Sequence, residues 1–141
     1  METSHETNFL VMPEHTNAMS PMIFGGSMFS EMDLCAANTV RRALYESKTC
    51  EAAVTHKAEV IYHMPCYLGD LLFLTSKIEE VRKKSLRVSV KVFREKCDKG
   101  TPILRCVATG EFVFVTVKAI ENLADKPELL PYAHHGLPVS K

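Results

Sequence analysis

The feature that most constrains this chain is a single long amphipathic segment followed by a series of strand-like segments. Projected at about 100° per residue, residues 26–46 separate apolar from polar side chains as a helix would. The apolar side comprises Phe29, Met32, Ala36, Val40, Ala43 and Leu44, and the polar side comprises Ser27, Ser30, Glu31, Asn38, Arg41 and Arg42. Beyond this segment the period falls from about 3.6 to about 2, which indicates strands. One helix must therefore cover a whole sheet.

One strand-like segment precedes the helix and four follow it. A short apolar run at 9–12 predicts the first strand, and the later ones are predicted at 54–64, 71–81, 86–92 and 103–118. Gly110 suggests a bend or bulge in the last strand, and residues 125–130 suggest a short helix in the tail. Short connections between the later segments favour antiparallel neighbours. We therefore expect an α+β fold in which an antiparallel five-stranded sheet wraps around one long central helix.

Length and composition indicate one ordinary globular domain. The 141 residues are expected to form a single domain, with its core at about 8–118 and a C-terminal tail at 119–141. Lys plus Arg equals Asp plus Glu, with 17 of each, so no overall charge attracts nucleic acid or a membrane surface. Without a signal peptide or a long apolar run, a cytoplasmic location is expected. The five cysteines form no C-x-x-C pair, which favours reduced thiols and predicts no metal site.

Asp33 is a carboxylate within the apolar side of the predicted helix, between Val40 and Leu44 in the projection. Burial of a charge without partners costs several kcal/mol or shifts its pKa, so such a residue is a candidate for function. A structural alternative is that Asp33 caps or pairs with a group outside the helix. As a catalytic group, Asp33 could act as a general base for water or attack a carbonyl directly.

The start of the helix adds two further kinds of chemical group. Gly25 and Gly26 lack a Cβ, and backbone N–H groups at a helix start can bind an anion or an oxyanion. Asp33 follows Gly26 by seven residues, about two helical turns. Asn17, in the preceding loop, could polarise a carbonyl or orient a water molecule. Tight packing of the glycines and a turn role for Asn17 are the structural alternatives.

The order of these elements resembles that of the hotdog-fold acyl-CoA thioesterases. The resemblance rests on Thr16-Asn17, Phe24-Gly25-Gly26, Met32-Asp33 in a long helix, and Pro65-x-x-x-Gly69-Asp70 in a turn. It extends from about residue 16 to residue 118 and is closest to the single-domain bacterial acyl-CoA hydrolases and to each half of the brain-type acyl-CoA hydrolase. The family implies hydrolysis of an acyl-CoA thioester without metal or organic cofactor. It also implies a homodimer with a continuous sheet and active sites at the interface, often assembled into a tetramer or hexamer.

The resemblance assigns roles to individual residues. Asp33 matches the catalytic carboxylate, and Gly25 and Gly26 match the positions whose amides face the thioester carbonyl. Asn17 resembles the catalytic asparagine, contributed by the opposite subunit. In this chain eight residues separate Asn17 from Gly25 where the family usually has seven, and Ser20 or Met19 stands near the expected glycine, so the loop is altered.

The resemblance and the sequence also suggest where the two ends of the substrate would bind. The CoA-binding residues are expected in a polar turn between two strands, at Arg82, Lys83, Lys84, Ser85 and Arg87. The side chains expected to shape the acyl pocket are Met28, Phe29, Met32 and Tyr62. A solvated hairpin is the alternative for the basic turn.

Two other functions fit the same fold. A hotdog hydratase or dehydratase needs a histidine near its catalytic acid, commonly five residues after an aspartate, and here that residue is Asn38. A non-catalytic acyl-CoA-binding module would normally accompany a DNA-binding segment. Cys35 is interpreted as a buried, inert thiol. His56 and His63 lie on opposite faces of one predicted strand and are interpreted as structural.

Overall fold

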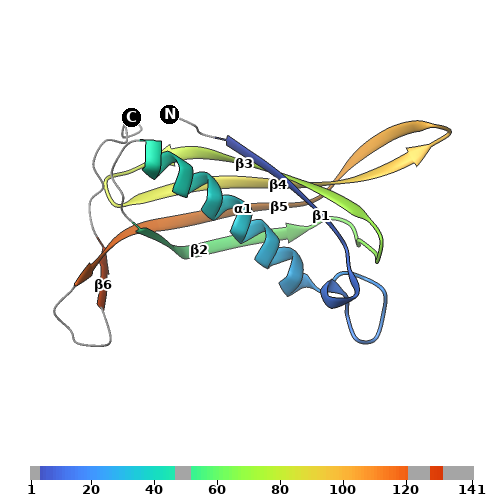
Figure 1. Cartoon of the computed structure of the whole chain (residues 1–141), viewed down its shortest axis with the longest axis horizontal. Coiled ribbons are helices and arrows are strands. Elements are labelled where there is room, and N and C mark those ends of the chain that lie inside the picture. Colours follow the sequence, from blue (N-terminus) through green and yellow to red (C-terminus); the bar gives the residue numbers. More distant parts are fainter. Residues whose placement is uncertain (1–3, 47–51, 121–127, 132–141) are drawn as a thin grey trace.

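The computed structural model describes residues 4–46, 52–120 and 128–131, and within them the chain forms one long helix and six strands (Figure 1). The elements in chain order are β1 (Ser4–Leu10), the short 3-10 helix η1 (Pro13–His15), α1 (Gly25–Glu46), β2 (Ala52–Tyr62), β3 (Leu71–Val81), β4 (Ser85–Asp98), β5 (Thr101–Ile120) and β6 (Glu128–Pro131). The central helix and the strands that follow it are confirmed, and β3 has the predicted bounds.

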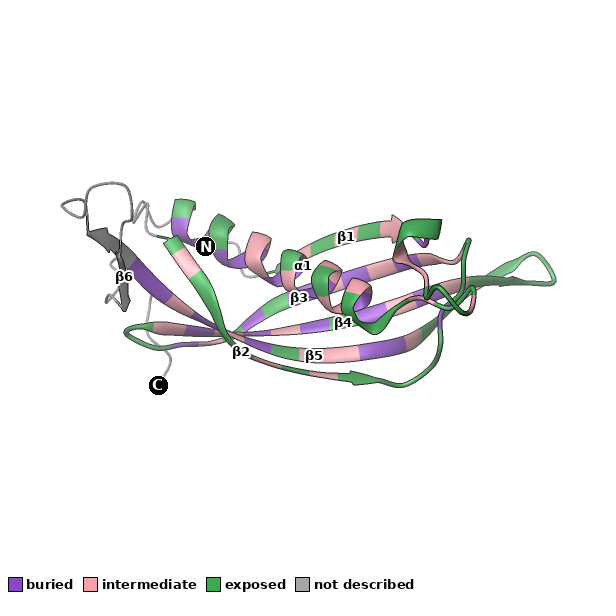
Figure 2. Ribbon diagram, turned by 90° about the horizontal axis from the view of Figure 1, so that it is seen from below, coloured by how far each residue is buried: buried purple, intermediate pink, exposed green. Residues whose placement is uncertain are grey.

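The strands form one antiparallel sheet with the order β1-β3-β4-β5-β2, and β6 also pairs with β5. β1 and β2 therefore end this path on opposite sides, and β2 pairs with β5 alone among the described strands. The helix α1 crosses one face of the sheet, with its buried residues on the side toward the strands (Figure 2). The expected α+β architecture, a sheet around a single helix, is confirmed.

The predictions at the two ends of the described chain were wrong in detail. The first strand spans Ser4–Leu10 and not residues 9–12, because this edge strand alternates only between exposed and half-buried residues and so lacks a strong apolar pattern. Residues 128–131 form β6, antiparallel to residues 117–120 of β5, where part of a short helix was expected. Residues 125–127 of that predicted helix lie outside the described residues.

Gly110 was expected at a bend or a bulge, and the bulge is excluded. It pairs in regular register with Val60 on one side and Val90 on the other. A Cβ on Gly110 would lie 2.9 Å from Cε of Met32 and 2.9 Å from Cε2 of Phe112. The glycine thus makes room for a helix side chain to lie directly on the sheet.

The core is formed by the inner face of β3, β4 and β5 together with one side of α1. Its buried helix residues are Met28, Met32, Cys35, Ala36, Thr39, Val40, Ala43 and Leu44. Cys35 is buried, as expected, and burial raises the pKa of its thiol. Within this core the hydroxyls of Thr39 and Ser76 are hydrogen-bonded to each other, and both lie within hydrogen-bond distance of the Cys35 carbonyl, so that one hydroxyl donates to the other and the second donates to that carbonyl. This polar contact fixes α1 to β3 at one axial position, because buried hydroxyls must keep their partners.

Candidate active site

Asp33 lies on α1 directly beside a fully buried residue, Met32, but its own side chain is only half-buried. The Thr55 hydroxyl, on β2, donates a hydrogen bond of 2.8 Å to Oδ1 of Asp33. The sequence placed Asp33 inside the apolar side of the helix, whereas in the structure it borders the core and points to the strand at the sheet edge. The carboxylate is therefore held in one orientation by a neutral donor.

Thr55 was not identified from the sequence. A threonine is common in strands, and nothing in the local pattern sets this one apart. The pairing of β2 with β5 shifts register between Thr55 and Lys57, so a bulge adjoins this position. Bulges re-aim side chains next to active sites in many proteins. Only the packing of β2 against α1 reveals the contact with Asp33.

The start of α1 presents two unpaired amides. The N–H groups of Ser27 and Met28 donate to the Phe24 carbonyl, at 3.0 and 3.2 Å. The N–H groups of Gly25 and Gly26 have no acceptor within the described part of the chain, and both glycines are exposed. A Cβ on Gly26 would lie 3.1 Å from the Phe24 ring, so the bare backbone suits the close packing there. These two N–H groups can donate hydrogen bonds to a negatively charged oxygen.

Asn17 lies in an exposed turn that accounts for the longer spacing to the helix. Its backbone N–H donates to the Met22 carbonyl at 2.8 Å, and its own carbonyl accepts from Ser20 at 3.2 Å. Its side-chain Oδ1 accepts from the Met19 N–H at 3.0 Å. The side-chain oxygen thus closes the turn, and the amide Nδ2 is the part of Asn17 that could meet a substrate.

The loop that carries Asn17 rests on the turn between β2 and β3. The Ile23 N–H donates to the Cys66 carbonyl, and the Leu68 N–H donates to the Pro21 carbonyl, both at 2.8 Å. The helix start is therefore placed by a turn that is more than 40 residues away in the chain.

That turn is itself held by a buried arginine. Arg94 on β4 is 6% exposed, and its Nη1 donates to the Pro65 carbonyl at 2.9 Å and lies 3.8 Å from Oδ2 of Asp70. The same Asp70 oxygen accepts from the Tyr67 N–H at 2.8 Å. The Cys66 thiol beside them has its pKa raised to about 11 by burial, while the Arg94 charge opposes that rise. The sequence did not single out Arg94.

The four residues expected in the acyl pocket occupy different environments. Met28 and Met32 are buried in the protomer core, and Phe29 is half-buried with its ring 5.6 Å from that of Phe112. Tyr62 is about half exposed at the end of β2. The acyl pocket therefore stays a prediction.

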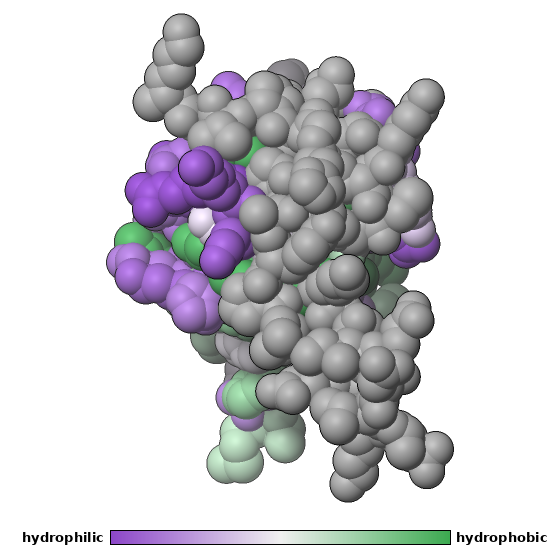
Figure 3. Space-filling model, turned by 90° about the vertical axis from the view of Figure 1, so that its left-hand side faces the viewer, coloured by the Kyte–Doolittle hydropathy of each residue, from purple (hydrophilic) through white to green (hydrophobic). Residues whose placement is uncertain are grey.

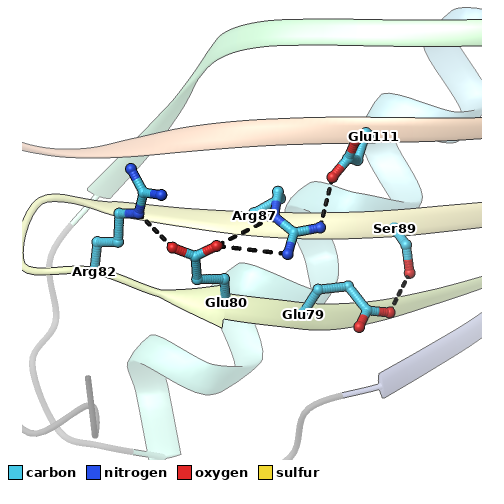
Figure 4. Close-up of polar contacts among 6 residues, drawn as sticks. All are labelled: Glu79, Glu80, Arg82, Arg87, Ser89 and Glu111. Atoms are coloured by element: carbon cyan, nitrogen blue, oxygen red, sulfur yellow. Dashed lines mark hydrogen bonds and ion pairs between the residues drawn. The ribbon is translucent and has the colours of Figure 1, made fainter. Parts of the chain in front are cut away.

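The residues expected to bind CoA lie around the turn between β3 and β4. The Arg82 guanidinium contacts Glu80, and Arg87 contacts both Glu80 and Glu111, the latter at 2.5 Å (Figure 4). The pKa of Glu80 is lowered, chiefly by its hydrogen bond from Arg82. These contacts lie on the sheet face opposite α1, since the neighbours of Arg87 in β4 face the core.

Lys83 and Lys84 differ from the two arginines. Both are exposed, and neither forms an ion pair with a residue that the structure describes. The Lys84 carbonyl accepts from the Thr116 N–H at 3.0 Å and the Ser85 carbonyl accepts from the Arg82 N–H at 2.8 Å, so the turn itself is ordered. Hydrophilic side chains gather at the end of the molecule where this turn lies (Figure 3).

An apolar groove of about 510 Å³ runs between α1 and β2. Its lining includes Leu34, which follows Asp33 directly, together with Ala37, Tyr45, Ala53 and Phe114. Leu34 and Tyr45 are both 57% exposed. Asp33 and Thr55 do not line this groove, but its lining includes Leu34, next to Asp33 in the chain, and Ala53, two residues before Thr55.

No group of three or more His, Cys, Asp or Glu side chains is arranged to hold a metal ion in residues 4–46 and 52–120. The one long helix in this part of the chain is too polar to cross a membrane.

The chain matches a known protein family and superposes on several solved structures. The family model described as the Thioesterase superfamily matches residues 21–101, more than half of the chain. Among solved structures, an acyl-CoA hydrolase from Staphylococcus aureus, in complex with butyryl-CoA and CoA, superposes with a TM-score of 0.75 at 21% identity over 99% of this chain and 76% of the other. Structures of that enzyme also include variants in which an asparagine, an aspartate or a threonine is replaced by alanine.

Two further structures are somewhat more similar in sequence. A hexameric hotdog-fold thioesterase of Campylobacter jejuni has a TM-score of 0.69 at 26% identity, over 90% of this chain and 88% of the other. A hexameric broad-specificity acyl-CoA thioesterase has a TM-score of 0.66 at 26% identity, over 79% and 78%. The expected hotdog fold is confirmed.

Proposed function

We propose that this chain, which belongs to the thioesterase superfamily, hydrolyses the thioester of acyl-CoA to a free acid and CoA. Thioester hydrolysis follows from the family, and acyl-CoA is the substrate named for the similar hotdog enzymes. The observation that carries the proposal is the Asp33 carboxylate, held by Thr55 at 2.8 Å beside the open edge of the sheet.

Asp33 can serve as the base or as the nucleophile. The Thr55 hydrogen bond engages Oδ1, which leaves Oδ2 free for either of two routes. It can accept a proton from the water that attacks the thioester, or it can attack the thioester carbonyl itself, which forms an anhydride as the C–S bond breaks and CoA leaves as a thiolate; water then hydrolyses the anhydride to the free acid. Both routes require a carboxylate that is ionised and fixed in orientation. A donor on one oxygen supplies the orientation without neutralising the charge.

The Gly25 and Gly26 amides would stabilise the oxyanion of an active site. The aspartate in that site would be Asp33 of another protomer, not Asp33 of the same helix. Seven residues of α-helix span about 10 Å, whereas an oxyanion donor must lie about 3 Å from the carbonyl oxygen under attack. One active site would therefore combine Asp33 and Thr55 of one protomer with Asn17, Gly25 and Gly26 of another.

A homodimer formed through β2 would bring these groups together. β2 pairs only with β5 among the described strands, and on the helix side of the sheet the exposed Tyr62 of β2 contacts the start of α1 while the exposed Leu34 of α1 lines the groove between α1 and β2. Exposed apolar surface of this kind marks an interface. Assembly into a hexamer, as in the similar enzymes from other sources, is part of this proposal, with a tetramer as the alternative.

The CoA phosphates would bind at the turn between β3 and β4. Arg82 and Arg87 already contact carboxylates, so Lys83 and Lys84 are the cations that a phosphate can engage without displacing a partner. Arg82, Arg87 and Ser85 would instead keep the turn in shape. The reaction proposed here requires no metal or organic cofactor, since a carboxylate and backbone amides supply its acid–base and electrostatic chemistry.

The decisive experiment measures CoA thiol release from a panel of acyl-CoA substrates by the wild type and by Asp33→Asn. We expect turnover to fall by about 100-fold or more in Asp33→Asn, with an unchanged fold by circular dichroism. Asp98→Asn, at the exposed end of β4, is the matched control and should keep wild-type turnover. Wild-type turnover in Asp33→Asn would refute the assignment, and tight acyl-CoA binding by a wild type that releases no thiol would favour the non-catalytic binding module.

A further inference from the structure

The Tyr62 side chain makes a contact that neither the family resemblance nor the proposed mechanism uses. Its hydroxyl, at the end of β2, donates a hydrogen bond of 2.7 Å to the carbonyl oxygen of Gly25, the first residue of α1. The hydroxyl also lies 3.7 Å from the position that a Cβ on Gly25 would take. The sequence placed Tyr62 in the acyl pocket, whereas this contact reaches the helix start.

The acceptor of this bond belongs to the same peptide group as one of the two unpaired amides. The carbonyl of Gly25 and the N–H of Gly26 are the two ends of one planar, resonance-coupled amide. A hydrogen bond received by the oxygen draws electron density away from the nitrogen and makes the N–H a stronger donor. Hydrogen bonds linked in this way strengthen each other by roughly 10–30%.

We propose that Tyr62 is a positioning residue, which orients and polarises the Gly25–Gly26 peptide so that the Gly26 amide binds the oxyanion more strongly. This inference rests on the proposed function, because it assumes that the Gly26 amide faces the thioester carbonyl. It assigns Tyr62 a role in the transition state, distinct from contact with the acyl chain.

The surroundings of the bond support this role. Two consecutive glycines give the helix start more backbone freedom than other residues would, so a fixed contact there restricts a mobile peptide. The β2 end of the contact is rigid, because Tyr62 pairs with Ala108 and the next N–H, that of His63, donates to the Val107 carbonyl at 2.8 Å. Partial burial raises the pKa of Tyr62, so its hydroxyl remains a donor at neutral pH.

The test compares Tyr62→Phe with Tyr45→Phe and with the wild type. Tyr45 is also half exposed, but its hydroxyl accepts from Arg41 near the other end of α1, which makes it a matched control. We expect Tyr62→Phe to lower kcat by roughly 2- to 8-fold, because it removes about 10–30% of the contribution of one oxyanion-hole donor, with KM within about twofold of wild type. Tyr45→Phe should leave both constants unchanged.

A spectroscopic measurement separates this inference from the proposed function. In protein labelled with ¹⁵N-glycine, the Gly26 amide proton should move upfield in Tyr62→Phe and stay in place in Tyr45→Phe, because a weaker donor is less deshielded. An unmoved Gly26 resonance, a wild-type kcat in Tyr62→Phe, or a change confined to KM would each overturn the inference. A wild type without thioesterase activity would refute the proposed function, and the Gly26 resonance would still decide whether Tyr62 polarises the peptide.

Discussion

Replacing Gly110 with alanine tests how closely α1 lies on the sheet. Gly110 does not have a positive φ, so its backbone accepts alanine, and on conformational grounds the change would stabilise a strand by about 0.5–1 kcal/mol. The added methyl, however, would lie 2.9 Å from both Met32 Cε and Phe112 Cε2 and 3.3 Å from Val60 Cγ2. Overpacking of this kind costs about 1–3 kcal/mol. The two effects have opposite signs, and we expect the clash to prevail.

A double-mutant cycle with Met32 isolates the contact. Met32→Ala alone should cost about 2–5 kcal/mol, because Met32 is fully buried. In the Met32→Ala protein the methyl group added by Gly110→Ala no longer meets the Met32 side chain and fills part of the new cavity. The destabilisation caused by Gly110→Ala should therefore be about 1–2 kcal/mol smaller there than in the wild type. The destabilisation that remains measures the contact of the new methyl with the Phe112 ring, which is less able to move aside than the flexible end of a methionine.

Denaturant unfolding gives the four free energies of this cycle. All four proteins must be compared at one protomer concentration, because an oligomer links assembly to stability. A more stable Gly110→Ala protein, or additive costs in the double variant, would refute the close approach of Met32 to Gly110. Since Met32 precedes Asp33, we also expect Gly110→Ala to lower turnover more than its loss of stability explains.

Two further predictions concern a buried thiol and the basic turn. The pKa of Cys66 is raised from 9.0 to about 11 in the folded chain, so its stabilising contribution is complete below pH 9 and is lost as the pH rises toward 11. The melting temperature of Cys66→Ala should therefore fall less than that of the wild type between pH 8 and pH 11. The same change at the exposed Cys97 should leave the dependence of melting temperature on pH as it is in the wild type. The double change Lys83→Ala and Lys84→Ala should raise KM for acyl-CoA about 3- to 10-fold at low salt with little effect on kcat, and Arg87→Ala should chiefly lower stability; an unchanged KM would remove the turn from the CoA site.

Hydrophobic periodicity predicts a helix or strand correctly where one side of the element is buried and the other is exposed to solvent. For this reason the sequence predicts α1 and the inner parts of β2 to β5 correctly. It fails at 93–95, where the buried residue is the charged Arg94 and not an apolar one. It also fails at 96–98 and at 101–102, where β4 and β5 continue as a hairpin whose residues 96–102 are exposed on both faces. A segment without a buried face carries no alternation that a reader of the sequence could detect.

Local sequence pattern also fails to predict correctly the two outlying strands, β1 and β6. β1 is recognisable as a strand through its ladder with β3, from Ser4 opposite Lys77 to Leu10 opposite Leu71. β6 is likewise defined by its pairing with residues 117–120. Strand formation at these positions depends on backbone groups offered by a distant segment, which local composition does not reveal.

The fold class, the helix start with its two glycines and the prominence of Asp33 can all be predicted from residue type and short-range spacing. That Asp33 borders the core and receives a hydrogen bond from Thr55 depends on how α1 packs against β2. The packing of Met32 against Gly110 and the contact of Tyr62 with the first peptide of α1 depend on the same arrangement of helix and sheet. Each of these contacts joins residues that are distant in the chain, and packing alone determines which of them meet.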